Sequence, residues 1–304
     1  MRTALVLAIL AAALALSAAA GVLIGSVAIA PGDVVGALLG STDVNGTIVR
    51  ELRLPRVLGA ALVGGSLAAA GALLQGLLRN PLADPFVTGT SAGATLAAVL
   101  LVWRLARLGG PTTVLTVLLA GVVLTSFVGA VVTFVLVSSD RLALRLRAVL
   151  GWLQGGVSVI SWQELAVAAL VVAAGFLAAL LLARRVDAYA FGEETAATLG
   201  VDPDRTTTAV LVATALLSGA AVALAGLVGF VGLVVPHALR FVVGATHSRL
   251  VPASFLAGAV ALVLADLGAR TLIAPGELPL GAITGLVGAP FFLGLLVRQR
   301  RFVV

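Results

Sequence analysis

The sequence has no cysteine and no lysine, and it is poor in charged and aromatic side chains. Without cysteine, the chain forms neither disulfides nor thiolate metal sites. Only 11% of its 304 residues are charged and 61% are hydrophobic, whereas a water-soluble domain carries about 25% charged residues. The composition excludes an ordinary soluble domain and indicates a chain whose solvent is the lipid bilayer.

All 19 basic residues are arginines, and the formal net charge is +6. A nucleic-acid-binding surface gathers its basic residues in one patch or stripe, but these arginines are spread between apolar segments. We therefore expect no nucleic acid among the partners.

Long uncharged stretches rich in Ala, Leu, Val and Gly recur along the chain. We predict an all-α polytopic membrane helix bundle of about nine to ten spans, at about 20 residues per crossing. It forms a single transmembrane domain, residues 1–304. The first stretch is longer than the core of a signal peptide, so we expect a retained first helix. The stretches are Thr3–Gly32, Val57–Leu78, Phe86–Trp103, Leu108–Ser139, Leu165–Ala183, Thr206–Leu239, Leu250–Ala265 and Leu278–Val297.

Five motifs follow one another along the chain. They are RLPRVLGAALVGGSLAAAGALLQGLLRNPLADPFVTGTSAGA, LLAGVVL, FGEETAATLGVD, GLVGFVGLVVPHALRFVVGATHSRLVP and LLADLGARTLIAPGELPLGAITGLVGAPFFLGLL. Over nearly the whole chain this order closely resembles the FecCD-type permeases, the membrane subunits of ATP-driven importers for iron–siderophore, haem and cobalamin. The resemblance implies the type II ABC importer permease fold and the import of a metal chelate of this kind.

The resemblance also implies the partners. Family members pair with a second permease copy, are driven by two copies of a cytoplasmic ABC ATPase, and are loaded by an extracytoplasmic substrate-binding protein. The chain has no G-x-x-x-x-G-K-[ST] and no H-E-x-x-H motif, so we expect no catalytic residue, no bound cofactor and no metal site. ATP and Mg²⁺ then belong to the partner ATPase. A homodimer and a pair with a sister permease both remain open, as does the cargo.

The segment LRNPLADP is a prolyl turn between two apolar stretches. Pro81 and Pro85 lack an N–H and disfavour helix before them, so they impose irregular backbone. By resemblance, Asn80, Pro81 and Leu82 form the cytoplasmic gate that closes the pathway. The alternative is an ordinary polar loop in which Arg79 is an interfacial anchor.

The segment FGEETAATLGVDPDR, within residues 187–205, resembles the coupling segment of the family, a pair of short cytoplasmic helices that dock on the ATPase. Glycine followed by two glutamates suits a helix start, and a later glycine suits its stop. The alternative is a solvated loop between two spans. The predicted coupling residues are Gly192, Glu193, Glu194, Thr195, Ala196, Leu199 and Gly200, with Ala197 completing a small apolar contact face.

Three arginines, Arg53, Arg56 and Arg270, match positions that dock the binding protein in the cobalamin-importing relative, and Arg50 could join them. Guanidinium forks suit bidentate pairing with carboxylates of a partner. The alternative is interfacial snorkelling, with Asp266 and Arg270 as an i,i+4 ion pair on one helix face.

The two histidines carry no predicted catalytic role. His237 follows Val-Pro in a family motif and is interpreted as a hydrogen-bonded packing residue rather than a haem ligand. His247 is predicted to lie in a short polar loop.

One region departs from the family. Relatives carry a further span after the prolyl turn, whereas TLAAVLLVWRLARLGGPTT runs straight through, which shortens the region around 86–110 by about one hairpin. A single crossing by Phe86–Trp103 would move the coupling segment outside, away from ATP. We therefore predict that this stretch re-enters the membrane, which leaves both termini on the cytoplasmic side of the cytoplasmic (inner) membrane. A transport-compromised permease lacking one span is the alternative.

A secondary transporter or channel without an ATPase is the competing function class, because such proteins are also bundles with broken helices. They commonly carry acids within the membrane for ion coupling. Here the middle of each predicted span has essentially none, which favours the importer.

Overall fold

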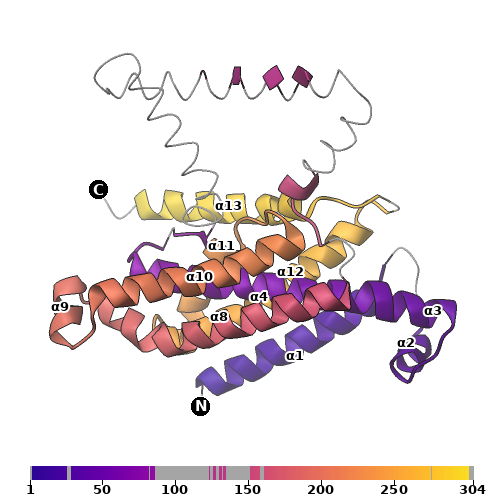
Figure 1. The fold of residues 1–304 in the computed structure, drawn as a ribbon, viewed down its shortest axis with the longest axis horizontal. Helices are drawn as coiled ribbons and strands as arrows, with labels where there is room; N and C mark the ends of the chain where they lie inside the picture. The colour runs from indigo at the N-terminus through magenta and orange to yellow at the C-terminus, as the bar shows by residue number, and fades with distance from the viewer. Residues whose placement is uncertain are drawn as a thin grey trace.

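The computed structural model describes residues 2–25, 29–81, 83–85, 151–157, 161–274 and 276–300, with single positions between 123 and 134. This part of the chain is helical and has no strand, so the predicted all-α class is confirmed (Figure 1). A π-helical turn, Ile48–Arg53, leads into α4. The helices are α1 (Arg2–Leu23), α2 (Pro31–Leu38), α3 (Val44–Thr47), α4 (Leu54–Leu77), α8 (Trp162–Tyr189), α9 (Glu193–Thr198), α10 (Pro203–Ala225), α11 (Val231–Val243), α12 (His247–Thr271) and α13 (Leu280–Arg300).

Several of the described helices are long and apolar enough to cross a bilayer, which makes this a multi-pass membrane protein. Two shorter apolar helices, Val231–Val243 and Leu280–Gly294, accompany them. The predicted stretch Phe86–Trp103, and most of Leu108–Ser139, lie outside the described residues. The candidate spans are Thr3–Leu23, Val44–Leu77, Trp162–Tyr189, Pro203–Ala225 and His247–Thr271.

The centre of the bundle is α4. In its span 83% of the most apolar stretch is buried within the chain, compared with 17% in the span of α1. Small residues allow this burial, because a Cβ on Gly64 would overlap the carbonyl oxygen of Gly258, and one on Gly71 would overlap that of Gly232. Backbones that approach so closely are the packing expected for membrane helices rich in glycine.

The closely spaced glycines and Pro236 in GLVGFVGLVVPH predict a break in the apolar stretch Thr206–Leu239, and the structure has one. The helix α10 ends at Ala225 and is followed by Gly226, whose φ is 62°, and α11 starts after Phe230, whose φ is 68°. At 1.5 Å per residue, the 13 residues of α11 extend about 20 Å, too short to cross a bilayer alone.

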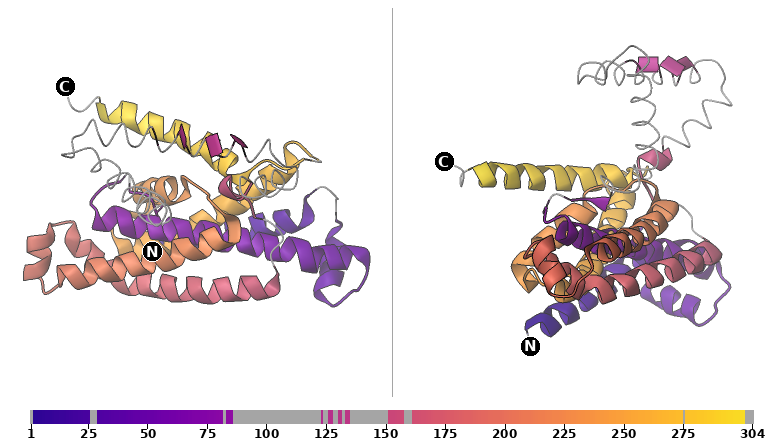
Figure 2. Two further views of the ribbon diagram at one scale, coloured as in Figure 1. Left: turned by 45° about the horizontal axis from the view of Figure 1, so that its top comes forward. Right: turned by 60° about the vertical axis from the view of Figure 1, so that its left-hand side comes forward.

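The helix α4 contains 24 residues and is therefore about 36 Å long. It connects the two ends of the bundle. We call "α2 end" the region of residues 31–56 and 266–277, and "α9 end" the region of residues 75–81, 186–200 and 240–249. Figure 1 shows α2 and α9 at opposite ends, and Figure 2 shows α13 extending outward beside the helices packed around α4.

Candidate functional site

The prolyl turn follows directly on α4 at the α9 end. Arg79 has a φ of 49°, in the left-handed region that a residue with a Cβ rarely adopts. The N–H of Asn80 donates to the carbonyl oxygen of Gln75 at 3.2 Å, which fixes the reversal. Asn80 is exposed and Pro81 is partly buried, while Leu82 lies outside the described residues. The turn is ordered by its own hydrogen bonds, and its gate role remains a prediction.

The side chain of Gln75 attaches the end of α4 to the broken helix α11. It is 1% exposed, and its Nε2 donates to the carbonyl oxygens of Gly232 at 3.4 Å and Leu233 at 3.1 Å. Pro85 packs on the same glycine, where a Cβ would lie 2.7 Å from the proline Cδ. The prolyl turn therefore rests against the first turn of α11.

The predicted coupling segment contains one short helix. The helix α9 begins after Gly192, with φ 98°, and the chain turns at Gly200, with φ 81°, as the sequence predicts. The expectation of a pair of short helices is wrong. The side chain of Asp202 caps the next helix and Pro203 occupies its first turn, so the long α10 starts at once.

The predicted contact face of α9 is only partly available to a partner. Glu194, Thr195 and Ala197 are exposed, and Leu199 is 63% exposed. Ala196 is fully buried within the chain, where it packs in a cluster with α8 and α10. Ala196 thus attaches α9 to the bundle and leaves its neighbours to face outward.

A tyrosine that the sequence analysis missed closes the base of this loop. Tyr189 is 1% exposed, and its hydroxyl donates to the carbonyl oxygen of Pro203 at 2.8 Å. The same hydroxyl lies 3.3 Å from Oγ1 of Thr207. The bond joins the last residue of α8 to the first of α10, so α9 is carried on a closed loop. The chain's single tyrosine was the available signal.

The prolyl turn and the coupling segment meet. The Nη1 atom of Arg79 lies 3.8 Å from the position of a Cβ on Gly192. Beneath them is a cavity of about 240 Å³, lined by residues of α4, α8, α11, the prolyl turn and the start of α12. The structure thus brings together two segments that the sequence separates by about a hundred residues.

His247 is the first residue of α12 and not part of a loop, which corrects the sequence prediction. It is 5% exposed. Its backbone N–H and its Nδ1 lie 2.8 and 2.6 Å from Oδ1 of Asp187. On the other side its ring touches α4, because a Cβ on Gly76 would overlap the imidazole. His247 therefore joins α12 to both α8 and α4.

Arg56 forms an ion-pair network at the α2 end. Its Nε donates to Oδ1 of Asp266 at 3.0 Å, and its Nη1 and Nη2 donate to the two carboxylate oxygens of Glu277 at 3.0 and 2.9 Å. Arg270 Nε lies 3.0 Å from Oδ2 of Asp266, so the predicted i,i+4 pair is confirmed. Hydrogen bonding from Arg56 lowers the pKa of Glu277, a residue the sequence analysis did not single out.

Arg53 and Arg270 are 6% and 7% exposed. Arg53 Nη1 donates to the carbonyl oxygens of Val22 at 2.6 Å and Leu23 at 2.9 Å, and Arg270 Nη2 donates to that of Gly21 at 3.2 Å. The last carbonyls of a helix lack intrahelical partners and carry its negative dipole end. These two arginines cap α1. Both guanidinium groups are buried in this structure, and the docking role of the four arginines stays a prediction.

Arg50 and Arg56 remain accessible at the α2 end. Arg50 is partly buried and its Nη2 donates to the carbonyl oxygen of Ser41 at 2.6 Å. The side chain of Arg56 is 18% exposed and that of Glu277 is 54% exposed. A docking role is thus limited to this accessible rim, and it remains a prediction.

His237 lies on α11 between two aromatic rings. Its ring centroid is 5.5 Å from that of Phe241 and 6.2 Å from that of Phe291, with edge-on geometry. Neither ring nitrogen has a hydrogen-bond partner among the described residues. His237 is a packing residue, as predicted, but its expected hydrogen bond is absent from this part of the chain.

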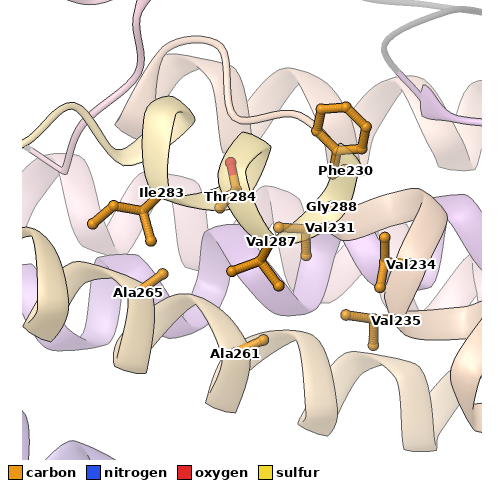
Figure 3. Close-up of a pocket in the computed structure, with 10 residues that line it drawn as sticks. All are labelled: Phe230, Val231, Val234, Val235, Ala261, Ala265, Ile283, Thr284, Val287 and Gly288. Atoms are coloured by element: carbon orange, nitrogen blue, oxygen red, sulfur yellow. The ribbon is translucent and has the colours of Figure 1, made fainter. Parts of the chain in front are cut away.

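A small apolar cavity of about 120 Å³ lies between α11, α12 and α13 (Figure 3). Phe230 packs against Gly288, where a Cβ would overlap the phenyl ring. Thr284 brings the only hydroxyl among the labelled side chains. Ligand sites combine apolar walls with convergent polar groups, so we interpret this cavity as a packing gap beneath α13.

The geometry now defines a class of protein: a multi-pass permease with the ABC importer permease fold. The FecCD transport family matches residues 9–108 and 96–298, two pieces that overlap within the region where the sequence departs from the family pattern. The chain belongs to the FecCD transport family.

Named relatives agree with this family. The chain is 42% identical over 274 residues to the cobalamin import system permease protein BtuC of Halobacterium salinarum, covering 82% of this chain and 73% of that protein. It is 38% identical over 279 residues to the hemin transport system permease protein HmuU of Yersinia pestis, covering 82% and 83%. A solved metal-chelate type ABC transporter in an inward-facing conformation is 28% identical, with a TM-score of 0.73 over 96% of this chain and 98% of that one.

Proposed function

We propose that this permease carries a metal chelate of the cobalamin, haem or iron–siderophore class across the cytoplasmic membrane, driven by a separate ABC ATPase. The position of Arg79 beside Gly192, with its Nη1 3.8 Å from where a Cβ on that glycine would lie, is the observation that carries the proposal. It joins the predicted gate to the predicted coupling segment at one end of α4, so a push on α9 can reach the turn directly.

The proposed ATPase contact is the outer face of α9 and the turn after it. Its outward-facing residues are Glu194, Thr195, Ala197 and Leu199. The buried Ala196 and the hydrogen bond from the Tyr189 hydroxyl to Pro203 attach the segment to the bundle. Such an anchored, exposed segment can transmit displacement to the membrane helices. ATP and Mg²⁺ would be bound by the partner, and this chain would bind no cofactor.

The proposed orientation puts the α9 end in the cytoplasm. Arg79, Arg184, Arg185, Arg205 and Arg249 lie at or near this end of the chain's helices, and cytoplasmic loops carry an excess of Arg and Lys. Figure 1 shows α1 beginning and α13 ending toward the same end, which supports the proposal that both termini are cytoplasmic.

The α2 end would then receive the extracytoplasmic binding protein. The exposed Glu277 and the accessible edge of Arg56 offer one charge of each sign at the rim, and Arg50 lies nearby on the same helical run. A second permease copy would complete the pathway, with two ATPases below.

Uptake by reconstituted vesicles tests the proposal. The permease, its ATPase and its binding protein would be placed in lipid vesicles and supplied with labelled haem, ferric siderophore or cobalamin. Uptake of one chelate that requires ATP on the α9 side is expected. Uptake without ATPase would instead show a secondary transporter, and a requirement for ATP on the α2 side would reverse the orientation.

A matched pair of variants tests the coupling face. Leu199→Asp puts a charge on an exposed apolar residue and is expected to reduce both co-purification with the ATPase and uptake by about tenfold or more, as a buried interfacial charge costs several kcal/mol. Thr42→Asp puts the same charge on an exposed residue at the α2 end and is expected to leave co-purification unchanged.

A further inference from the structure

The cavity at the α9 end has a charge imbalance that the transport function does not explain. Two arginines line it, Arg79 from the prolyl turn and Arg240 from α11, together with one carboxylate, Asp187. Asp187 already accepts two hydrogen bonds from His247. The walls therefore carry a surplus of positive charge.

Arg240 is the less satisfied of the two cations. Its Nε and Nη2 atoms are buried and have no hydrogen-bond partner among the described residues, and no carboxylate of this part of the chain lies within ion-pair distance of it. The side chain as a whole is partly buried, and burial of charged nitrogens without a partner is unfavourable. An anion that entered the cavity would remove this penalty and gain charge-assisted hydrogen bonds.

We propose that this cavity binds a phosphate group, with Arg79 and Arg240 as its ligands. Arginine forks match the oxygens of phosphate in bidentate geometry. The volume of about 240 Å³ suffices for a tetrahedral oxyanion with waters, since one water needs only about 10–15 Å³. Gln75 also lines the cavity, and its unpartnered Oε1 is an acceptor for a hydroxyl of the ligand.

The phosphate has two chemical sources, an anionic lipid headgroup and free phosphate. The cavity lies where α4, α8 and α11 end, and basic pockets between membrane helices at this level bind phospholipid headgroups. Because Arg79 also lies beside Gly192, a bound phosphate would hold the prolyl turn near the coupling segment. The binding assay below involves no transport, so its outcome does not depend on the proposed transport function.

Thermal unfolding of the purified full-length permease in neutral detergent tests the site. One arm adds inorganic phosphate against chloride at equal ionic strength. The other adds short-chain phosphatidylglycerol against phosphatidylcholine. The wild type is expected to unfold at a higher temperature with phosphate, with phosphatidylglycerol or with both, because a ligand of the folded state stabilises it. Response to the lipid alone identifies a headgroup site, and response to both identifies a general phosphate site.

Arg240→Gln and Arg249→Gln form the matched pair of variants. Arg249 is exposed at the same end and does not line the cavity. Arg240→Gln is expected to weaken binding by about tenfold or more, the usual effect of losing a charge-assisted hydrogen bond, while Arg249→Gln binds as the wild type does. Without added anion, Arg240→Gln should unfold no earlier than the wild type, because it removes an unpaired buried cation.

Two results would overturn the proposal. One is that neither phosphate nor phosphatidylglycerol changes the unfolding temperature of the wild type. The other is that Arg240→Gln and Arg249→Gln respond equally, which would mean that the anion acts on the surface charge in general.

Discussion

The arginines at the two ends of the bundle differ in their hydrogen-bond and ion-pair partners. At the α2 end, Arg53 and Arg270 cap α1 and Arg56 bridges two carboxylates. At the α9 end, Arg79 lies in a left-handed turn and Arg240 has unpartnered buried nitrogens. At the α2 end these three arginines find their partners within the chain, whereas at the α9 end Arg79 and Arg240 have no ion-pair partner among the described residues and α9 is largely exposed. This difference indicates that contacts within the chain hold the α2 end in place, and that the α9 end is the surface available to bind a partner.

The largest expected effect comes from removing the shared carboxylate of the α2 end. Asp266→Ala leaves Arg56 and Arg270 without their common partner, and breaking a buried pair costs about 3–5 kcal/mol. Arg205→Ala at the α9 end removes an exposed pair, 86% and 52% accessible, and should cost about 0–1 kcal/mol. Free energies of unfolding in mixed micelles measure both. Equal losses would refute the contrast between a buried and an exposed network.

Close packing at the α9 end gives the next effect. Gly76→Ala forces a Cβ into the ring of His247 and should cost about 1–3 kcal/mol, the usual effect of overpacking. Gly219→Ala on α10 has open space around it and should be neutral or stabilising by up to about 1 kcal/mol. The same unfolding measurement compares them. A harmless Gly76→Ala would show that His247 moves away freely and does not join α4, α8 and α12.

Removing the hydrogen bond from the Tyr189 hydroxyl to Pro203, at the base of the α9 loop, should have a smaller, local effect on stability. Tyr189→Phe removes a hydrogen bond worth about 1 kcal/mol, so amide exchange across residues 190–202 should accelerate about fivefold. Trp162→Phe removes a comparable bond to the carbonyl of Arg50 at the α2 end, 3.2 Å long, and should leave that exchange unchanged. Amide hydrogen exchange followed by mass spectrometry measures both variants. Unchanged protection of residues 190–202 in Tyr189→Phe would show that this tyrosine does not stabilise the coupling segment.

The smallest effect is a pH dependence at the α2 rim. Arg56 lowers the pKa of Glu277 below its ordinary value of 4.5, so the stabilisation is full above 4.5 and is lost as the pH falls through the lowered folded-state pKa. Glu277→Gln should abolish this acid-dependent part of the unfolding curve. Because the side chain is half exposed, the difference is small. Superimposable acid curves for the two proteins would contradict the pairing.

The fold class and the positions of most described helices followed from hydrophobic runs, because a backbone in lipid must satisfy its own hydrogen bonds as helix. The break near Phe230 followed from glycines and a proline, and the limits of α9 from Gly192 and Gly200. The prediction of a pair of short coupling helices was wrong, because Asp202 and Pro203 start the long helix α10 directly. Local motifs therefore predicted several of the positions at which helices start and stop, but not all of them.

The sites were less predictable. Matching motifs grouped Arg50, Arg53, Arg56 and Arg270 as one docking surface, but the structure assigns two of them to the end of α1. His247 was assigned to a loop, although it starts α12 and contacts Asp187. Burial and partner choice depend on which helices pack together, and a single sequence does not contain that information.

The sequence by itself determined that the chain lives in a bilayer, that it is helical, and that its motifs follow the order of the FecCD family, since composition and local spacing set these properties. The tertiary structure alone decided which charged groups of distant segments find partners. Arg56 meets Asp266 across 210 residues of sequence, and Arg270 meets the end of α1 across 249. Only helix packing brings such residues within the distance of about 3.2 Å that a hydrogen bond requires.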